Sequence, residues 1–234
     1  MSGHSKWSTI KRAKEAKDAK RSNLFTKLSK SITMAAKGDP SLETNFKLRI
    51  AVDKARSLNM PKDNIERAIK RAAGTGEGAN IESLLYEAYG PEGVAMIIDI
   101  LTDNKNRAIS NLKHILSKRG GNLGNSGSVL WMFELKGEII LDKAELTEDE
   151  ELLVIEAGAD DIVKEDVIKV IVDKDDLTQA KDKLQTNGFE ISDSDIIYLA
   201  KEKVSVKDDE RLLKLMGDLD DDDDVNNIYT NANI

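Results

Sequence analysis

The glycines at positions 74, 76 and 78 divide the chain into two parts that differ in charge and in hydrophobic period. Residues 1–73 contain eighteen basic and seven acidic residues, a net charge of +11, so residues 74–234 carry −19 in a chain whose net charge is −8. Before the glycines, apolar residues recur at helical spacing, whereas after them continuous apolar runs typical of buried strands appear. The break predicts a basic helical domain followed by acidic domains of strands and helices, an α+β fold.

Three helices are predicted before the glycines. The first spans residues 23–37 and ends at Gly38-Asp39-Pro40, because proline cannot continue a helix. Ser41 is the predicted N-cap of a second helix that runs to about residue 58. A third helix covers residues 65–72. Together these segments predict a three-helix domain, with a basic arm and a linker, over residues 1–78.

The acidic part predicts two sheets. Predicted strands at 94–101 and 129–135 flank a helix at 105–118, which makes one β-α-β unit. Residues 138–199 follow in the β-α-β-β-α-β order of a ferredoxin-like domain. A last strand, helix and strand at 203–231 is too small to fold alone, so we expect it to complete the first sheet as a second ferredoxin-like domain. The predicted domains are residues 1–78, residues 79–136 plus 200–234, and the inserted residues 137–199.

The basic arm, Met1 to Arg21, has few large apolar side chains and many cations. A solvated helix face is the ordinary interpretation of such a run, but a merely solubilising surface would mix its charges. His4 and Trp7 lie beside the lysines and could stack on unpaired bases while ammonium groups meet phosphates. The predicted nucleic-acid-binding residues are His4, Lys6, Trp7, Lys11, Arg12, Lys14, Lys17, Lys20, Arg21 and Lys27, with secondary contacts at Lys62, Arg67, Arg71, Asn104, Arg107 and Asn122.

No residue pattern supports catalysis, a metal site or a cofactor. The chain has no cysteine, and its two histidines, His4 and His114, have no neighbouring nucleophile or metal-ligand partner. Gly120 to Gly124 could cradle a phosphate but lacks the P-loop spacing, so a turn is the favoured interpretation. Asp220 to Asp224 is predicted to be a solvated acidic loop rather than a cation site. We expect a protein that is not an enzyme.

Several motifs occur in an order that resembles the YebC/PmpR family, which includes the mitochondrial translational activator of cytochrome oxidase subunit one. They are GHSKW at 3–7, NMPKDNIERAIKR at 59–71, YEAYGP at 86–91, TDNKNR at 102–107 and GGNLGNSGSV at 120–129. The resemblance covers nearly the whole chain. It implies a three-domain arrangement and two alternative roles, relief of ribosome stalls at proline-rich stretches or DNA-binding transcriptional regulation.

The residues favour RNA over duplex DNA as the partner, with ribosomal or transfer RNA in the ribosome as the expected target. No helix-turn-helix with a convincing recognition helix is apparent, and the acidic domains would repel a duplex. Duplex DNA remains the alternative, and a protein-interaction scaffold is a third. With no apolar run long enough to span a membrane and no signal peptide, a cytoplasmic protein without membrane contact is expected. The oligomeric state stays open.

Overall fold

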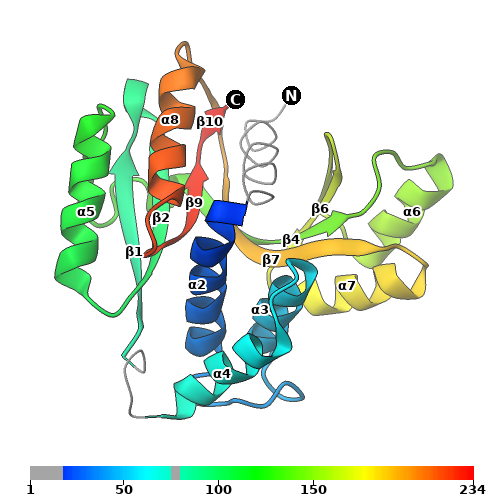
Figure 1. Ribbon diagram of the computed structural model, residues 1–234. Coiled ribbons are helices and arrows are strands. Elements are labelled where there is room, and N and C mark those ends of the chain that lie inside the picture. Colours follow the sequence, from blue (N-terminus) through cyan, green and yellow to red (C-terminus); the bar gives the residue numbers. More distant parts are fainter. Residues whose placement is uncertain (1–17, 75–79) are drawn as a thin grey trace.

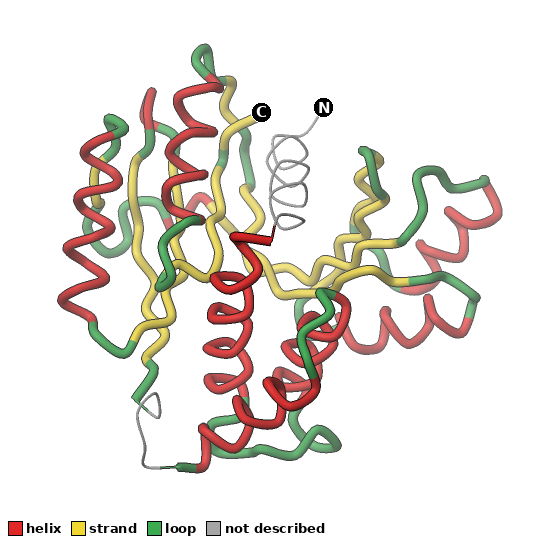
Figure 2. Tube along the Cα trace, viewed as in Figure 1, coloured by secondary structure: helices red, strands yellow, loops and turns green. Residues whose placement is uncertain are grey.

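The computed structural model describes residues 18–74 and 80–234, with the backbone alone described at 18–21 and 73. A helical part lies between two four-stranded sheets (Figure 1). The tube view in Figure 2 shows the helices of this part below the strands that connect the two sheets. The α+β class expected from the charge and period break is confirmed.

The helical part consists of α2 (Asp18–Ala35), α3 (Phe46–Ser57) and α4 (Lys62–Ala73). Ile32 of α2 and Leu48 of α3 are completely buried in their shared core, and a buried side chain of this size stabilises a fold by about 1.5–3 kcal/mol. The predicted N-cap of the second helix is wrong, because Asn45 rather than Ser41 accepts the hydrogen bond from the Leu48 amide, at 3.0 Å. The side-chain amide of Asn45 also donates to the backbone oxygens of Ala35 and Asp39, and a serine has no such amide.

The first sheet contains a central strand that the sequence prediction missed, β1 (Glu82–Tyr89). It pairs antiparallel with β2 (Ala95–Thr102), and a 3-10 turn (Pro91–Gly93) joins the two strands. The order across the sheet is β3-β1-β2-β9. Helix α5 (Lys105–Lys118) packs on this sheet together with α8 (Asp209–Asp220).

The strand predicted at residues 129–135 does not join the first sheet. The two-residue strand β3 (Asn122–Leu123) takes that place beside β1. A 3-10 turn, η2 (Leu130–Met132), then leads into β4 (Phe133–Leu141), which belongs to the second sheet. Gly137 lies inside β4, where a Cβ would meet Val172 Cγ2 at 2.8 Å and Leu177 Cβ at 3.0 Å. The close approach of β4 to helix α7, which begins at Leu177, therefore requires this glycine.

The second sheet has the order β5-β6-β4-β7, in which the first and third strands along the chain are central, as in ferredoxin-like domains. Helix α6 begins with a capping box between Thr147 and Glu150 and ends at Gly158, which adopts a left-handed conformation. Helices α6 and α7 pack together on one face of this sheet. The remaining bounds are α6 (Glu148–Ala157), β5 (Asp161–Lys164), β6 (Ile168–Asp173), α7 (Leu177–Thr186) and β7 (Ile191–Ala200).

The C-terminal segment returns to the first sheet. Strand β9 (Val225–Thr230) pairs antiparallel with β2, as expected for residues that complete the sheet. The short strands β8 (Val204–Ser205) and β10 (Ala232–Asn233) pair with each other. The pairing agrees with the prediction, whereas the domain boundaries drawn from it stay a prediction.

Candidate nucleic-acid interface

Most of the predicted interface belongs to the basic arm, on which the described residues give no information. Lys20 and Arg21 lie in the first turn of α2, where the backbone alone is described. The predicted contacts that fall outside the described residues are His4, Lys6, Trp7, Lys11, Arg12, Lys14 and Lys17. The binding role of the arm therefore stays a prediction.

Helix α4 presents a basic face to solvent. Its opposite face buries Ile65 and Ala68 in the helical core, so the intervening side chains must point outward. Lys62 is 87% exposed, and its ion pair with Glu66 is long, at 3.6 Å. An exposed pair of this kind holds a side chain only weakly. The exposed cations of α4 are Lys62, Arg67, Lys70 and Arg71.

The two arginines of α4 are oriented by short polar contacts. Arg67 donates to the Asp63 carbonyl oxygen at 3.2 Å and to the Asn64 side chain, one turn earlier in the same helix. Arg71 donates to the Ser29 hydroxyl of α2 at 3.2 Å. Neither arginine takes part in an ion pair among residues 18–74 and 80–234. Their charges are therefore left for an external anion.

Lys27 has an internal partner instead. Its side chain is 12% exposed, and its ammonium group donates to the Asp220 carbonyl oxygen at 2.5 Å and lies 3.6 Å from the carboxylate. Lys30, one turn later, pairs with Asp224 at 2.7 Å and donates to the Asp223 carbonyl oxygen at 2.8 Å. Lys27 thus contacts the acidic run at residues 220–224, and its predicted role as a phosphate contact would require that pair to open.

The TDNKNR motif also serves the fold. Asn104 caps α5 by accepting a hydrogen bond from the Arg107 amide at 3.1 Å. The Arg107 guanidinium binds Asp224 through two nitrogens and Asp103 through one, at 2.8 Å. Asn122 is exposed on β3, and its amide group donates to the Leu123 carbonyl oxygen at 3.2 Å. Of these predicted secondary contacts, Asn104 and Arg107 are already engaged within the chain.

The prediction of a solvated acidic loop at residues 220–224 is correct for the exposed Asp221 and Asp223 and wrong for Asp224. Asp224 is 3% exposed and lies between Lys30 of α2 and Arg107 of α5. Burial acts to raise the pKa of Asp224, but the hydrogen bonds from Lys30 and Arg107 outweigh it and lower the pKa. We call Lys27, Lys30, Arg107, Asp220 and Asp224 the acidic clamp, because it fastens the helical part to the first sheet.

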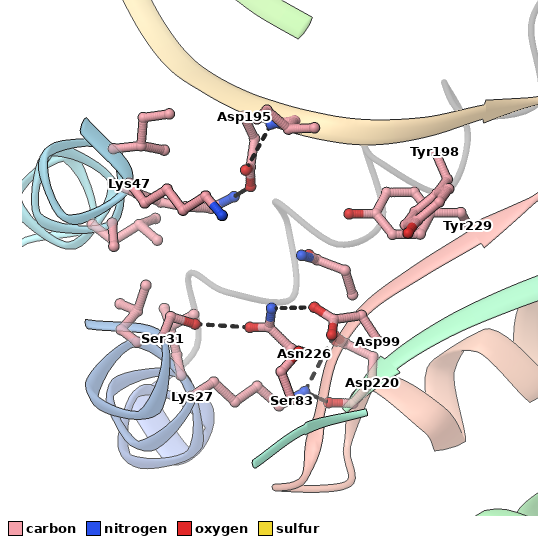
Figure 3. A pocket seen from close by; sticks show the side chains of 18 of the residues that line it. Lys27, Ser31, Lys47, Ser83, Asp99, Asp195, Tyr198, Asp220, Asn226 and Tyr229 are labelled. Carbon is pink, nitrogen blue, oxygen red and sulfur yellow. Dashed lines mark hydrogen bonds and ion pairs between the residues drawn. The ribbon is translucent and has the colours of Figure 1, made fainter. Parts of the chain in front are cut away.

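A cleft of about 530 Å³ opens where the helical part meets both sheets. Figure 3 shows Lys47 of α3 on one side of it and the Tyr198–Tyr229 pair on the other. The two tyrosine rings meet edge to face, with centroids 5.4 Å apart. Burial raises the pKa values of both tyrosines, with nearby acidic side chains adding to the effect.

Charges of both signs line this cleft. Lys54 pairs with Asp195 at 3.0 Å and with Asp193 at 3.4 Å. Asp99 accepts a 2.7 Å hydrogen bond from the Asn226 side chain. Burial raises the pKa of Asp99 and the nearby Asp195 raises it further, whereas the hydrogen bond from Asn226 acts to lower it. Because carboxylates face it from two strands, the cleft is poorly suited to phosphate.

The glycine-rich segment forms a turn, as favoured from the sequence. The amides of Gly120, Gly121 and Gly124 donate to the backbone oxygens of Ser117, Leu116 and Glu87. Farther along, the Glu87 carboxylate accepts from the amides of Gly127, Val129 and Leu130 at 2.5, 2.6 and 2.7 Å. The amides of this segment are thus occupied by acceptors from the protein itself.

His114 is exposed on α5. Within residues 18–74 and 80–234, no three acidic or histidine side chains are grouped so that they could hold a metal ion. In the same residues, none of the helices combines the length and apolar character needed to cross a membrane.

The structure defines a class of α+β protein in which a basic helical part joins two four-stranded sheets, and strand β9 returns to pair with β2 of the first sheet. Residues 5–75 match the model of the TACO1/YebC N-terminal domain, and residues 81–232 match that of the TACO1/YebC second and third domain. The chain belongs to the TACO1/YebC family, which confirms the resemblance seen in its motifs.

Similar proteins cover the full chain. A probable transcriptional regulatory protein of Thermosipho africanus is 48% identical over 241 residues, covering 100% of this chain and 94% of the relative. A protein of the same description from Halothermothrix orenii is 46% identical over 244 residues, covering 100% and 96%. The crystal structure of the conserved hypothetical protein Aq1575 from Aquifex aeolicus superimposes with a TM-score of 0.86 and 38% identity, covering 93% of this chain and 92% of that one.

Proposed function

We propose that this protein is a non-enzymatic, nucleic-acid-binding regulator of gene expression whose target is structured RNA in the ribosome. The observation that carries the proposal is the segregation of charge, +11 over residues 1–73 against −19 over the rest. Cations gathered on one part of a molecule form the electrostatic footprint of a phosphate-binding surface. The exposed face of α4 supports it, since its arginines have no ion-pair partner in the described residues.

The distribution of charge over the molecule favours RNA over duplex DNA as the partner. The −19 of the two sheet-containing units would repel a long duplex that approached them, whereas a folded RNA can present phosphates to one end of the protein. Single-stranded and irregular RNA also offers unstacked bases to aromatic side chains such as Trp7. The family resemblance suggests relief of stalls at proline-rich stretches as the task at the ribosome.

A DNA-binding transcriptional regulator is the second candidate. It is favoured by the names of the relatives, which are described as probable transcriptional regulatory proteins. Duplex DNA would be expected to meet the same arm and α4, because phosphate attraction alone does not distinguish the two polymers.

Co-sedimentation with ribosomes, compared with retention on genomic DNA at the same salt concentration, tests the proposal. We expect retention with ribosomes at salt concentrations that release the protein from DNA. Combined substitution of Lys11, Lys14 and Lys17 by alanine should weaken ribosome binding, while Lys183→Ala on the acidic part should not. Stronger retention on DNA would favour the second candidate, and binding to neither polymer would support a protein-interaction scaffold.

A further inference from the structure

Trp131 is the most exposed large apolar side chain in the described residues, at 65%. It lies on the short turn η2, between Val129 and Phe133, which are both buried in the core that joins the two sheets. The indole N–H donates to the Ser128 carbonyl oxygen at 3.1 Å, which fixes the ring relative to the turn. The backbone is therefore anchored on both sides of an aromatic ring that faces solvent.

The turn that carries Trp131 is held by a buried carboxylate. Glu87 is 7% exposed, and its two oxygens accept from the amides of Gly127, Val129 and Leu130. The Tyr89 hydroxyl donates to the same Ser128 oxygen as the indole, at 3.2 Å. Because these bonds fix the turn before any ligand arrives, a flat partner could use the ring at little entropic cost.

A cation is bound to the backbone of the turn that carries the ring. The Lys201 amide donates to the Met132 oxygen at 2.9 Å, and the Lys201 ammonium group donates to the Trp131 oxygen at 2.9 Å. Lys203 follows two residues later and is exposed. Within the described residues, neither lysine belongs to an ion pair, so neither charge is neutralised by a carboxylate.

We infer that Trp131 is a stacking platform for an unpaired nucleobase, with the Lys201 ammonium group placed to meet the adjoining phosphate. A rigid exposed ring beside a cation is the arrangement with which proteins bind single-stranded nucleic acid without reading its sequence. The inference rests on the proposed function and deepens it, because it adds a site for single-stranded segments outside the basic helical part.

The surroundings set the strength of this site. Glu134 and Glu202 are exposed near the two lysines in the sequence, and their charges oppose phosphate. The site therefore contributes to binding alongside the basic arm rather than replacing it. Loss of the indole should reduce affinity for a single strand by about ten-fold, within the range known for base stacking.

The chain has two tryptophans, so single-tryptophan variants report separately on the two sites. In Trp7→Phe, all indole emission comes from Trp131. We expect a single-stranded uridine oligomer to quench this emission as it binds. The midpoint of the quenching should match the midpoint of binding, measured from the fluorescence anisotropy of a labelled copy of the oligomer. A blunt RNA duplex should bind through the arm without quenching Trp131, since its bases are already stacked.

Alanine variants in the full-length chain complete the test. Trp131→Ala should weaken single-strand binding about ten-fold and duplex binding little, and Trp131→Phe should retain part of the affinity. Lys201→Ala should lower the dependence of log K on log salt by about 0.7 for a single strand, with Lys183→Ala as the unaffected control. Equal melting temperatures across the variants show that the fold is intact.

Three results would overturn the inference. If Trp131 emission stays constant while the oligomer binds, Trp131 is not a stacking platform, and the proposed function is unaffected. An emission change that depends on protein concentration without RNA assigns the ring to a contact between two copies. If neither the uridine oligomer nor the RNA duplex binds at any salt concentration, the proposed function fails and the inference fails with it.

Discussion

Arg107 of α5 and Asp224, directly before β9, are joined through two guanidinium nitrogens, with Nη2 2.9 Å and Nε 3.1 Å from Oδ2. These residues are 117 positions apart in the chain. Lys30 of α2 reaches the other oxygen of the same carboxylate at 2.7 Å. A single buried carboxylate thus connects a helix of the first sheet to the helical part.

Asp224→Asn should destabilise the protein by about 2 kcal/mol, because two cations lose charged hydrogen bonds at a largely buried position. The free energy of unfolding in guanidinium chloride measures the effect. The matched control is Asp218→Asn on α8, which breaks the partly exposed pair with Arg119 and should cost less than about 1 kcal/mol. Equal losses in the two variants would show that the acidic clamp is no stronger than a surface pair.

Acid should weaken the same connection. The pKa of Asp224 is lowered in the folded protein, so its contribution to stability is complete above the ordinary aspartate pKa of about 4 and is lost as the pH falls through the lower folded value. The protection of the α2 amides against exchange, corrected for the intrinsic exchange rate at each pH, should therefore fall in the wild type as the pH drops below about 4. In Asp224→Asn this part of the pH dependence should be absent, and an unchanged profile would contradict the assignment.

Glu87→Gln should destabilise the protein by about 1–3 kcal/mol, because an amide oxygen replaces a carboxylate that accepts three backbone hydrogen bonds at a buried site. Thermal unfolding measures the loss, with the exposed Glu134→Gln as control. Near-ultraviolet circular dichroism of a Trp7→Phe background should also lose the signal of a fixed Trp131. A variant that melts earlier but keeps this signal would show that the carboxylate does not hold the turn.

Gly121→Ala should cost about 1–3 kcal/mol. A Cβ at this position would lie 2.6 Å from the Tyr89 carbonyl oxygen, and that oxygen is in the central strand β1, which has little freedom to move. The denaturant midpoint measures the change. Ser110→Ala, at an exposed position of the preceding helix, should stay within about 0.5 kcal/mol of the wild type.

Lys70→Ala and Arg71→Ala on α4 should each weaken RNA binding and reduce the salt slope by about one unit, as expected for single phosphate contacts. Filter binding at several salt concentrations measures both quantities. Lys183→Ala, an exposed lysine of α7, is the matched control and should change neither. If all three variants behave alike, the basic face of α4 is a solvated surface.

The sequence predicted elements well where local signals mark both ends. Helix α6 has a capping box at Thr147 and a left-handed Gly158 after its last turn, and its predicted bounds are those observed. Strand β1 was missed although Leu84, Tyr86 and Ala88 alternate along it and pack on the helices. The apolar Leu85 interrupts the alternation, and the polar residues Glu82, Ser83 and Glu87 lower the apolar content of the segment, so the period of two was not recognised.

The errors at the candidate interface have a different cause. Lys27 and Arg107 are residues of the type that binds phosphate. Their partners Asp220 and Asp224 are far away in the sequence, so no local pattern reveals these ion pairs. Ion pairs between residues more than a hundred positions apart depend on the tertiary fold, so a charge pattern cannot reveal them. The predicted contacts on α4 differ, because the buried apolar side of a helix already determines which side chains face solvent.

The turn that carries Trp131 leads directly into β4, so the way in which β4 and β7 pair determines how a force on the ring would be transmitted. Strands β4 and β7 pair along their length. The pairing runs from Phe133 opposite Ala200, near the first sheet, to Leu141 opposite Ile191. Only from Phe133 to Leu135 do these two strands form a ribbon by themselves, because β6 pairs with β4 from Lys136 onward. Sliding of the two strands would break several hydrogen bonds together, whereas two-stranded ribbons adopt a wide range of twist. Trp131 lies two residues before this ribbon begins, so a nucleobase that pulls on the ring would change the twist of the ribbon more readily than the register of its strands.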